Sequence, residues 1–286
     1  MASEKDIVFT TAGGTELKLD IFRPEGASKR TAIVFVHGGG WRQGSREMMW
    51  PNARAMAANG FTGVTVQYRL TPQAPWPAQI EDLKAAIRWT RANAARLDVD
   101  PDRIVLWGSS AGAHMVLLAA GTPNLAMFEG VSEPTRVSTE VSAVIAVHAP
   151  TEFYVGAADK RPGTPASALM GAAATEELAR AAGPLSYVTK DFPPVLLLHG
   201  TQDKVVHHSA SERMHDAMRA AHAPVDLHLF HGYPHGFAAF PSVRAMVVAE
   251  ANHFLDRTLI DPAKYAAEME QFALQRAAAQ ASQAAT

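Results

Sequence analysis

The chain has 286 residues, of which 48% are hydrophobic and 19% charged, and its formal net charge is −2. This balance is typical of a globular protein with a substantial core, and it lacks the clustered basic excess that a nucleic-acid partner requires. The chain has no cysteine, which excludes disulfides, a thiolate nucleophile and cysteine-ligated metals.

The first forty residues predict an antiparallel hairpin followed by a buried strand. Residues 6–10 and 15–22 flank the turn sequence TAGG, and apolar residues alternate with polar ones in the second segment. The run AIVFV at 32–36 is apolar throughout, as are strands of a parallel sheet covered by helices on both faces. It leads directly into HGGGW at 37–41, where three consecutive glycines cost backbone entropy and therefore need a reason.

Apolar runs and helical patterns then alternate to the end of the chain. Further strands are predicted at 60–66, 103–107, 143–147, 195–198 and 225–230. Helices are predicted at 45–58, 77–97, 111–120, 208–221, 242–259 and 263–282. This alternation predicts an α/β fold in one domain over 1–286, with a mostly parallel, doubly wound sheet between layers of helices.

The helix predicted at 77–97 shows the clearest two-sided pattern. Its apolar stripe consists of Ile80, Leu83, Ile87, Ala94 and Leu97. The charged residues of the same segment are Glu81, Lys84, Arg88 and Arg91, and helical spacing predicts that they face away from the core.

Two segments bear on accessibility and assembly. Residues 149–194 have no strand pattern, and they form either a lid-like insertion over the site or a surface excursion with one short helix at 175–182. The terminal helix, with Tyr265, Met269 and Phe272, packs either on the body or on a second copy in a homodimer.

The N-terminus lacks the apolar stretch of a secretory signal, and no run approaches the roughly 18 apolar residues that span a membrane. We therefore expect a cytoplasmic protein that does not associate with a membrane.

GSSAG at 108–112 follows a predicted strand and precedes a predicted helix. A sharp turn between a strand and a helix forces its central residue into unusual backbone angles, so small residues must flank it. Such a turn exposes a serine hydroxyl at the edge of the sheet, beside a helix N-terminus. Ser110 is therefore the predicted nucleophile. Ser109 is its nearest rival, and a plain serine helix cap is the structural alternative.

A serine nucleophile needs a base and an orienting carboxylate. His235 lies in a Gly/Pro-rich loop after the strand predicted at 225–230, and Asp203 follows the strand at 195–198. Both therefore lie at the carboxyl ends of parallel strands, on the side of Ser110. The alternatives to these two residues are His231 for the base and Asp226, Asp191, Asp159 or Glu152 for the carboxylate.

The glycines at 38–40 fit the same chemistry. Attack of a serine on an ester carbonyl creates an oxyanion, which preorganised backbone N–H groups stabilise. Backbone can approach the substrate only where side chains are absent, so Gly39 and Gly40 are predicted donors, together with Ala111 after the nucleophile. His37 is predicted to anchor this loop, and the neighbouring Trp41 to contact the substrate.

These motifs resemble the α/β-hydrolase superfamily, in its HGGG-bearing branch of carboxylesterases related to hormone-sensitive lipase. The resemblance is closest to the compact acyl esterases that include feruloyl-esterase-like members, and it runs from about residue 31 to 257. It rests on HGGGW, QYRLTPQAPWPAQIEDLKAAIRW, DPDRIVLWGSSAGAH, LLLHGTQDKVV and GYPHGF. The chain departs from the branch at Ser109, Ala113 and Gln73, and it lacks an N-terminal helical cap.

The resemblance implies a serine carboxylesterase acting on short-acyl, small-molecule esters, with no cofactor and no metal. The alternatives are an aryl formamidase or other amide hydrolase on the same machinery, and a non-catalytic binding protein on this scaffold. A metal hydrolase built on His228, His231 and His235 is disfavoured, because no H-E-x-x-H motif or suitably spaced carboxylate accompanies them.

Overall fold

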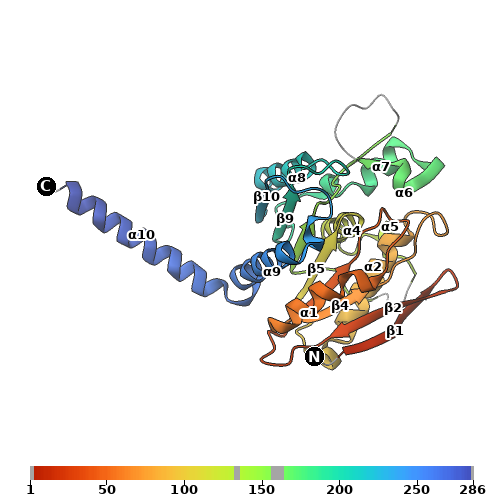
Figure 1. Ribbon diagram of the computed structural model, residues 1–286, viewed down its shortest axis with the longest axis horizontal. Coiled ribbons are helices and arrows are strands. Elements are labelled where there is room, and N and C mark those ends of the chain that lie inside the picture. Colours follow the sequence, from red (N-terminus) through yellow and green to blue (C-terminus); the bar gives the residue numbers. More distant parts are fainter. Residues whose placement is uncertain (1–2, 132–135, 156–163, 285–286) are drawn as a thin grey trace.

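The computed structural model describes residues 3–131, 136–155 and 164–284, and its centre is an eight-stranded sheet (Figure 1). The strand order across this sheet is β1-β2-β4-β3-β5-β6-β9-β10. The strands are β1 (Ser3–Ala12), β2 (Thr15–Phe22), β3 (Ala32–Val36), β4 (Thr62–Val66), β5 (Ile104–Ser109), β6 (Ala143–Val147), β9 (Val195–Gly200) and β10 (Val225–Phe230).

The pairing of the strands confirms the predicted fold class. β1 and β2 form an antiparallel hairpin, and β2 also pairs antiparallel with β4. The pairs β4–β3, β3–β5, β5–β6, β6–β9 and β9–β10 are all parallel. The carboxyl ends of six strands therefore meet at one edge of the sheet, which is where an α/β fold places its reactive groups. The assignment of the whole chain to one domain stays a prediction.

Ten α-helices, four 3-10 turns and one π-helical turn lie in the part of the chain that the structure describes. The α-helices are α1 (Trp50–Ala58), α2 (Ala78–Ala92), α3 (Ala94–Leu97), α4 (Ala111–Gly121), α5 (Ala126–Glu129), α6 (Ser167–Met170), α7 (Glu176–Ala182), α8 (Ser209–Ala220), α9 (Pro241–Leu255) and α10 (Pro262–Ala284). The 3-10 turns are η1 (Arg46–Met49), η2 (Gly171–Ala173), η3 (Pro184–Tyr187) and η4 (Phe237–Ala239), and η5 (Asp256–Ile260) is a π-helical turn.

Helices cover both faces of the sheet, because alternate residues of each central strand pack into two different cores. In β3, Ala32, Val34 and Val36 join a cluster that includes residues of α2, α4 and α8. Ile33 and Phe35 join a second cluster, which includes residues of α1 and α9. All five side chains are fully buried, which explains why this run has no polar alternation.

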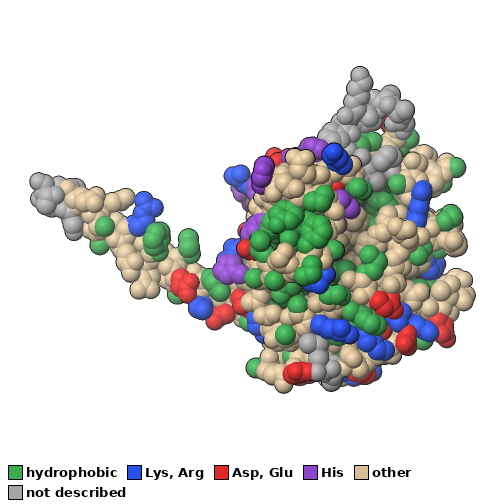
Figure 2. All heavy atoms as spheres, viewed as in Figure 1, with side chains coloured by type: hydrophobic (Ala, Val, Ile, Leu, Met, Phe, Trp, Pro, Cys, Tyr) green, Lys and Arg blue, Asp and Glu red, His purple; other side chains and the backbone are tan. Residues whose placement is uncertain are grey.

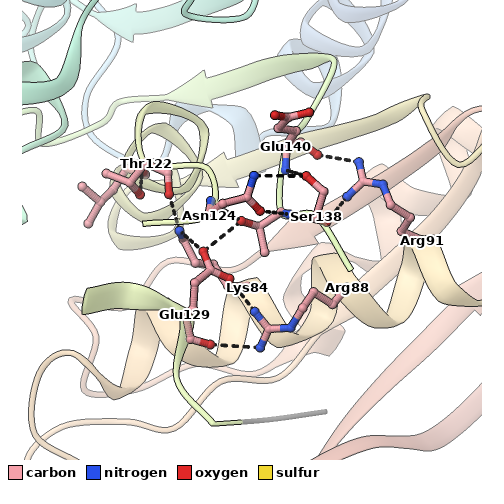
Figure 3. A network of polar contacts seen from close by, with 10 residues as sticks. Lys84, Arg88, Arg91, Thr122, Asn124, Glu129, Ser138 and Glu140 are labelled. Carbon is pink, nitrogen blue, oxygen red and sulfur yellow. Dashed lines mark hydrogen bonds and ion pairs between the residues drawn. The ribbon is translucent and has the colours of Figure 1, made fainter. Parts of the chain in front are cut away.

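The predicted exposure of Lys84 and Arg88 on α2 is wrong, although the predicted apolar stripe, which α2 and α3 share, is buried as expected. Nζ of Lys84 and Nη1 of Arg88 each lie 2.6 Å from a carboxylate oxygen of Glu129, the last residue of α5 (Figure 3). Lys84 also donates to the carbonyl of Thr122, just beyond α4. A buried cation is tolerated only when it is paired. Here the partner is more than 40 residues away, so helical periodicity could not reveal it.

The segment 149–194 contains several short elements over its described residues. A two-residue strand β7 (Phe153–Tyr154) pairs with β8 (Thr164–Pro165), which the sequence pattern did not predict. The elements α6, η2, α7 and η3 follow, and α7 confirms the helix predicted at 175–182.

Helix α10 projects away from the body, as Figure 1 and Figure 2 show. Its residues Met269, Phe272 and Leu274 are exposed, while the ring of Tyr265 lies 5.6 Å from that of His253 at the end of α9. The helix as a whole therefore does not pack along the body in this structure. The homodimer stays a prediction. Within the described residues, no helix combines the length and apolar character needed to cross a membrane.

Candidate active site

Ser110 occupies the turn between β5 and α4, where its backbone has φ +55° and ψ −117°. The small neighbours of this serine are sterically required. A Cβ on Gly108 would lie 2.3 Å from the carbonyl oxygen of Gly112, and a Cβ on Gly112 would lie 2.2 Å from that of Val36. No side chain fits at these separations, so both glycines allow β3, β5 and α4 to approach closely enough to form the turn. Such positive φ values are rare for non-glycine residues and are typical of functional sites.

Three side chains from three strand ends meet at this turn. Oγ of Ser110 lies 2.9 Å from Nε2 of His235, and Nδ1 of His235 lies 2.6 Å from Oδ2 of Asp203. Because an ionised carboxylate only accepts hydrogen bonds, Nδ1 carries the hydrogen and donates to Asp203. Nε2 is then left to accept from the serine hydroxyl. The structure thus brings together the three residues that the sequence predicted, in an arrangement suited to removing the serine proton.

The surroundings of Asp203 favour its ionised form. Burial by itself raises the pKa of this carboxyl, but hydrogen bonds from His199, His235 and the backbone N–H of Val206 outweigh it and hold the pKa well below its usual value. Oδ1 accepts from the N–H groups of Val205 at 2.8 Å and Val206 at 2.9 Å. These bonds also fix the carboxylate, so that Oδ2 faces His235.

The glycine loop after β3 lines the same cavity as Ser110. Gly39 has φ +118°, and a Cβ there would lie 2.0 Å from the carbonyl oxygen of Gln43. The carbonyl of Gly39 accepts from the N–H groups of Arg42 and Gln43. In a trans peptide the N–H points opposite to the carbonyl, so the N–H of Gly40 points away from this turn. The N–H of Ala111, at the first position of α4, has no partner within its helix.

His37 anchors this loop from behind. Its Nδ1–H donates to the carbonyl of Gly38 at 2.7 Å, and its ring stacks on Tyr68 with 4.3 Å between ring centroids. The hydroxyl of Tyr68 donates in turn to the carbonyl of His37 at 3.1 Å. Burial lowers the pKa of His37 to about 4, so this histidine is neutral at physiological pH.

Trp41 lies behind the loop and is absent from the cavity wall that Ser110 shares. Its side chain is 2% exposed, and its ring contacts those of His114 and Phe153. Its indole N–H donates to Nδ1 of His114 at 3.2 Å, and Nε2 of His114 donates to the carbonyl of Ala182 at 2.8 Å. Burial lowers the pKa of His114 to about 4. Direct substrate contact by Trp41 stays a prediction, and the observed role of its side chain is to connect loop, helix and insertion.

Two further histidines lie at the site, and the sequence analysis did not single them out. His148 directly follows β6 with φ +44°, and its ring lies 4.1 Å from that of His235. Burial first, and then the nearby His235 and His199, lower the pKa of His148 well below its usual value. Nε2 of His199 lies 3.3 Å from Oδ2 of Asp203 and 2.9 Å from the carbonyl of Val206. The signal was available, since both residues stand at carboxyl ends of predicted strands.

The residues considered as rivals are engaged elsewhere. Asp226 pairs with Arg257, Asp191 with Lys190 and Glu152 with Arg213. Nδ1 of His228 lies 3.6 Å from a carboxylate oxygen of Glu250. His231 is exposed, and Ser109 faces Nε2 of His148 at 3.4 Å rather than His235. Asp159 lies outside the described residues.

The cavity at Ser110 has a volume of about 450 Å³. Its wall includes Gly39, Gly40 and His235 from the site, and Asn52 and Arg244 from α1 and α9. No described residue of 149–194 belongs to this wall, so a lid role for that segment stays a prediction.

Within the described residues, one group of side chains could supply metal ligands. One potential ligand atom from each of His148, Asp203 and His235 lies within 4.8 Å of the others. A metal at that position would compete with the hydrogen bond between His235 and Asp203, and hence with the polarised serine. The donor set therefore suits a hydrogen-bonded catalytic group better than a resident metal centre.

Comparison with known proteins finds that this chain is similar to esterases. A family model, BD-FAE, matches residues 19–218. Esterase LipQ of Mycobacterium tuberculosis is 34% identical over 84% of this chain and 58% of its own length. Esterase LipC of the same organism is 29% identical over 88% of this chain and 64% of its own. The chain thus spans somewhat under two thirds of the length of these curated relatives.

Solved structures of similar fold cover nearly the whole chain. The apo form of Thermogutta terrifontis esterase 2 is 29% identical, with a TM-score of 0.79 over 90% of this chain and 95% of that one. Structures of the same esterase have propionate bound, butyrate bound, or the enzyme phosphorylated by paraoxon. Each of these is 28% identical to this chain.

Proposed function

The chain belongs to the BD-FAE family of α/β hydrolases, and from this premise we propose that it is a serine carboxylesterase acting on small carboxylic esters. One observation carries the proposal above the others. His235 lies 2.9 Å from Oγ of Ser110 and 2.6 Å from Oδ2 of Asp203, at the wall of a cavity large enough for a small ester. The names of the relatives described above, Esterase LipQ, Esterase LipC and Thermogutta terrifontis esterase 2, support the same reaction class.

In the first half of the proposed reaction, Oγ of Ser110 attacks the ester carbonyl carbon while its proton passes to Nε2 of His235. Asp203 stabilises the imidazolium that forms. The carbonyl oxygen becomes an oxyanion, which accepts hydrogen bonds from backbone N–H groups of Gly39, Gly40 and Ala111. The bond between the carbonyl carbon and the alcohol oxygen then breaks, the proton of His235 goes to the departing alcohol, and the acyl group stays on Ser110.

In the second half, a water molecule attacks the acyl-enzyme and gives its proton to Nε2 of His235. The tetrahedral intermediate collapses, the bond to Oγ breaks, and the same proton returns to Ser110. The carboxylic acid leaves and the free enzyme is restored. Every step uses the same imidazole, which must be neutral at the start of each half.

We propose acyl chains of about two to four carbons as the preferred substrates, on the resemblance to the compact acyl esterases. The relative from Thermogutta terrifontis, whose structures hold propionate and butyrate, supports this range. A cavity of about 450 Å³ lies in the lower half of the usual range for ligand pockets. Each methylene that does not fit costs on the order of 1–3 kcal/mol in catalytic efficiency.

The proposal is tested with 4-nitrophenyl esters of two to twelve carbons, beside a 4-nitroanilide and an aryl formamide. We expect Ser110→Ala to lower ester turnover by about 10⁶ and Ser109→Ala, its matched control, to be comparatively mild. Paraoxon should leave its phosphoryl group on Ser110, which peptide mass spectrometry locates. A phosphoryl group on another residue would contradict the assignment of Ser110 as the nucleophile. Better turnover of the formamide or anilide than of any ester would overturn the substrate class in favour of an amide hydrolase.

A further inference from the structure

One cation belongs to the wall of the catalytic cavity. Arg244, in the first turn of α9, lines the cavity together with Ser110 and His235. The lining residues that the structure describes include no aspartate and no glutamate. Nor does any described carboxylate form an ion pair with Arg244. A guanidinium is always charged in proteins, so the wall presents a positive charge that the cavity itself does not neutralise.

The guanidinium is held in place by one hydrogen bond to the protein, and one of its donors is buried without an acceptor. Its Nη2 donates to the carbonyl of Ala239 at 2.8 Å, on the neighbouring turn η4. Its Nε is buried without any hydrogen-bond partner. A guanidinium has five N–H donors, and leaving a buried donor without an acceptor is unfavourable. A ligand in the cavity that supplies acceptor oxygens to this guanidinium would add hydrogen bonds beyond the one that the protein provides.

The neighbouring wall suits an anion with a short apolar connection to the reacting carbonyl. Helices α1 and α9 pack against each other, and α1 contributes Asn52, which is 8% exposed, to the cavity. Its amide can donate a further hydrogen bond. Met48 and Met49 of η1 provide apolar surface beside it. A partly buried ion pair in such surroundings is screened less than one in water.

We infer that the ester this enzyme takes carries a carboxylate, which Arg244 binds while the ester carbonyl lies at Ser110. The inference rests on the proposed esterase function and adds the substrate class to it. A planar carboxylate matches the donor geometry of a guanidinium and can accept two parallel hydrogen bonds. If the carboxylate belongs to the acyl part, the product is a dicarboxylic acid. If it belongs to the alcohol part, the product is a hydroxy acid.

Two matched substrate pairs distinguish a carboxylate on the acyl part from a carboxylate on the alcohol part. Mono(4-nitrophenyl) glutarate and 4-nitrophenyl pentanoate have five-carbon acyl groups that differ in a terminal carboxylate. 4-Acetoxybenzoate and 4-acetoxybenzamide differ in the same way on the alcohol part. The kcat/KM of each is measured at neutral pH after subtraction of spontaneous hydrolysis, and the anionic-to-neutral ratio is compared between variants.

We expect Arg244→Gln to lower this ratio by about tenfold or more in one pair, the range for a lost charged hydrogen bond. Arg244→Lys should retain part of the preference, since the charge remains but the planar donor pair is lost. The matched control is Arg54→Gln, which makes the same charge change at an exposed residue of α1 outside the cavity wall. It should leave both ratios unchanged.

A wild-type measurement keeps the inference falsifiable if Arg244→Gln does not fold. Glutaramate, the monoamide of glutaric acid, should inhibit more strongly than the neutral pentanamide, or 4-hydroxybenzoate more strongly than 4-hydroxybenzamide. Equal inhibition within both pairs, or ratios unaffected by Arg244→Gln in a folded variant, would overturn the role of Arg244 while neutral esters are still hydrolysed. Absence of any hydrolysis that depends on Ser110 would overturn the proposed function itself, which is a distinguishable result.

Discussion

The indole N–H of Trp41 donates to Nδ1 of His114 across 3.2 Å, and this bond joins the glycine loop to the helix that follows the nucleophile. The backbone N–H of His114 itself donates to the carbonyl of Ser110 at 3.0 Å, one turn before it. Nε2 of His114 then donates to Ala182 in the insertion. One buried, neutral imidazole thus fixes the relative positions of the proposed oxyanion loop, the nucleophile helix and segment 149–194.

We expect Trp41→Phe to lower kcat by up to about 10²-fold with a smaller change in KM. The substitution keeps an aromatic ring but removes the donor, so the loop that carries Gly39 and Gly40 is less firmly placed, and a fully lost oxyanion donor costs about 10²–10³. An unpaired buried acceptor should also reduce the free energy of unfolding by about 1–3 kcal/mol. Steady-state kinetics and urea unfolding measure both effects.

Trp76→Phe is the matched control. The ring of Trp76 also lies beside His114, at 5.9 Å, but its indole N–H makes no hydrogen bond with that residue. If Trp76→Phe lowers kcat as much as Trp41→Phe does, the effect comes from loss of ring packing around His114 and not from the hydrogen bond.

These contacts show where sequence patterns reach their limit. Apolar runs identified the central strands, because burial on both faces favours apolar residues. The positions of Ser110, Asp203 and His235 just after parallel strands predicted that all three lie at the carboxyl edge of the sheet. By contrast, the hydrogen bond from Trp41 to His114 joins residues that are 73 positions apart, so adjacency to the glycines could not reveal it. The burial of Lys84 was missed for the same physical reason, because its partner Glu129 is distant in sequence.

Asp203→Asn should reduce kcat/KM by about 10⁴ on the precedent of serine proteases, with little loss of stability. The amide can offer its N–H to Nδ1 of His235, which favours the tautomer whose Nε2 carries the hydrogen and cannot accept from Ser110. Asp226→Asn is the control, because Asp226 lies at the amino end of β10 and pairs with Arg257. Near-normal rates for Asp203→Asn combined with an inactive Asp226→Asn would refute the assignment of the carboxylate.

Gly108→Ala should prevent the turn at Ser110 from forming normally. Its Cβ would lie 2.3 Å from the carbonyl oxygen of Gly112 and 2.5 Å from the amide nitrogen of Ala113, and neither backbone atom can move without displacing α4. We expect a loss of unfolding free energy of at least about 3 kcal/mol, or no soluble protein. Gly26→Ala, where an added Cβ meets nothing within 4 Å, should stay within about 0.5 kcal/mol of wild type.

The free energy of unfolding should fall as pH decreases from about 6.5 to about 4, because buried histidines are held neutral in the folded protein. Burial lowers the pKa of His37 and of His114 from the usual 6.5 to about 4, and it lowers that of His148 well below its usual value. Between these limits the unfolded chain binds protons that the folded chain does not, so acid favours unfolding. The contribution is fully present above pH 6.5.

For His37 and His114 the loss is at most about 3 kcal/mol each, at about 1.4 kcal/mol per pKa unit. Urea unfolding at half-unit steps from pH 7.5 to pH 4.5 measures it, with unfolding followed by both fluorescence and circular dichroism. His114→Gln should be less stable at pH 7.5 but should lose less on acidification, because one of the buried imidazoles is gone. His231→Gln removes an exposed imidazole and should keep the wild-type slope. A free energy of unfolding that stays constant across this range would show that these imidazoles are already protonated, or already solvated, in the folded protein.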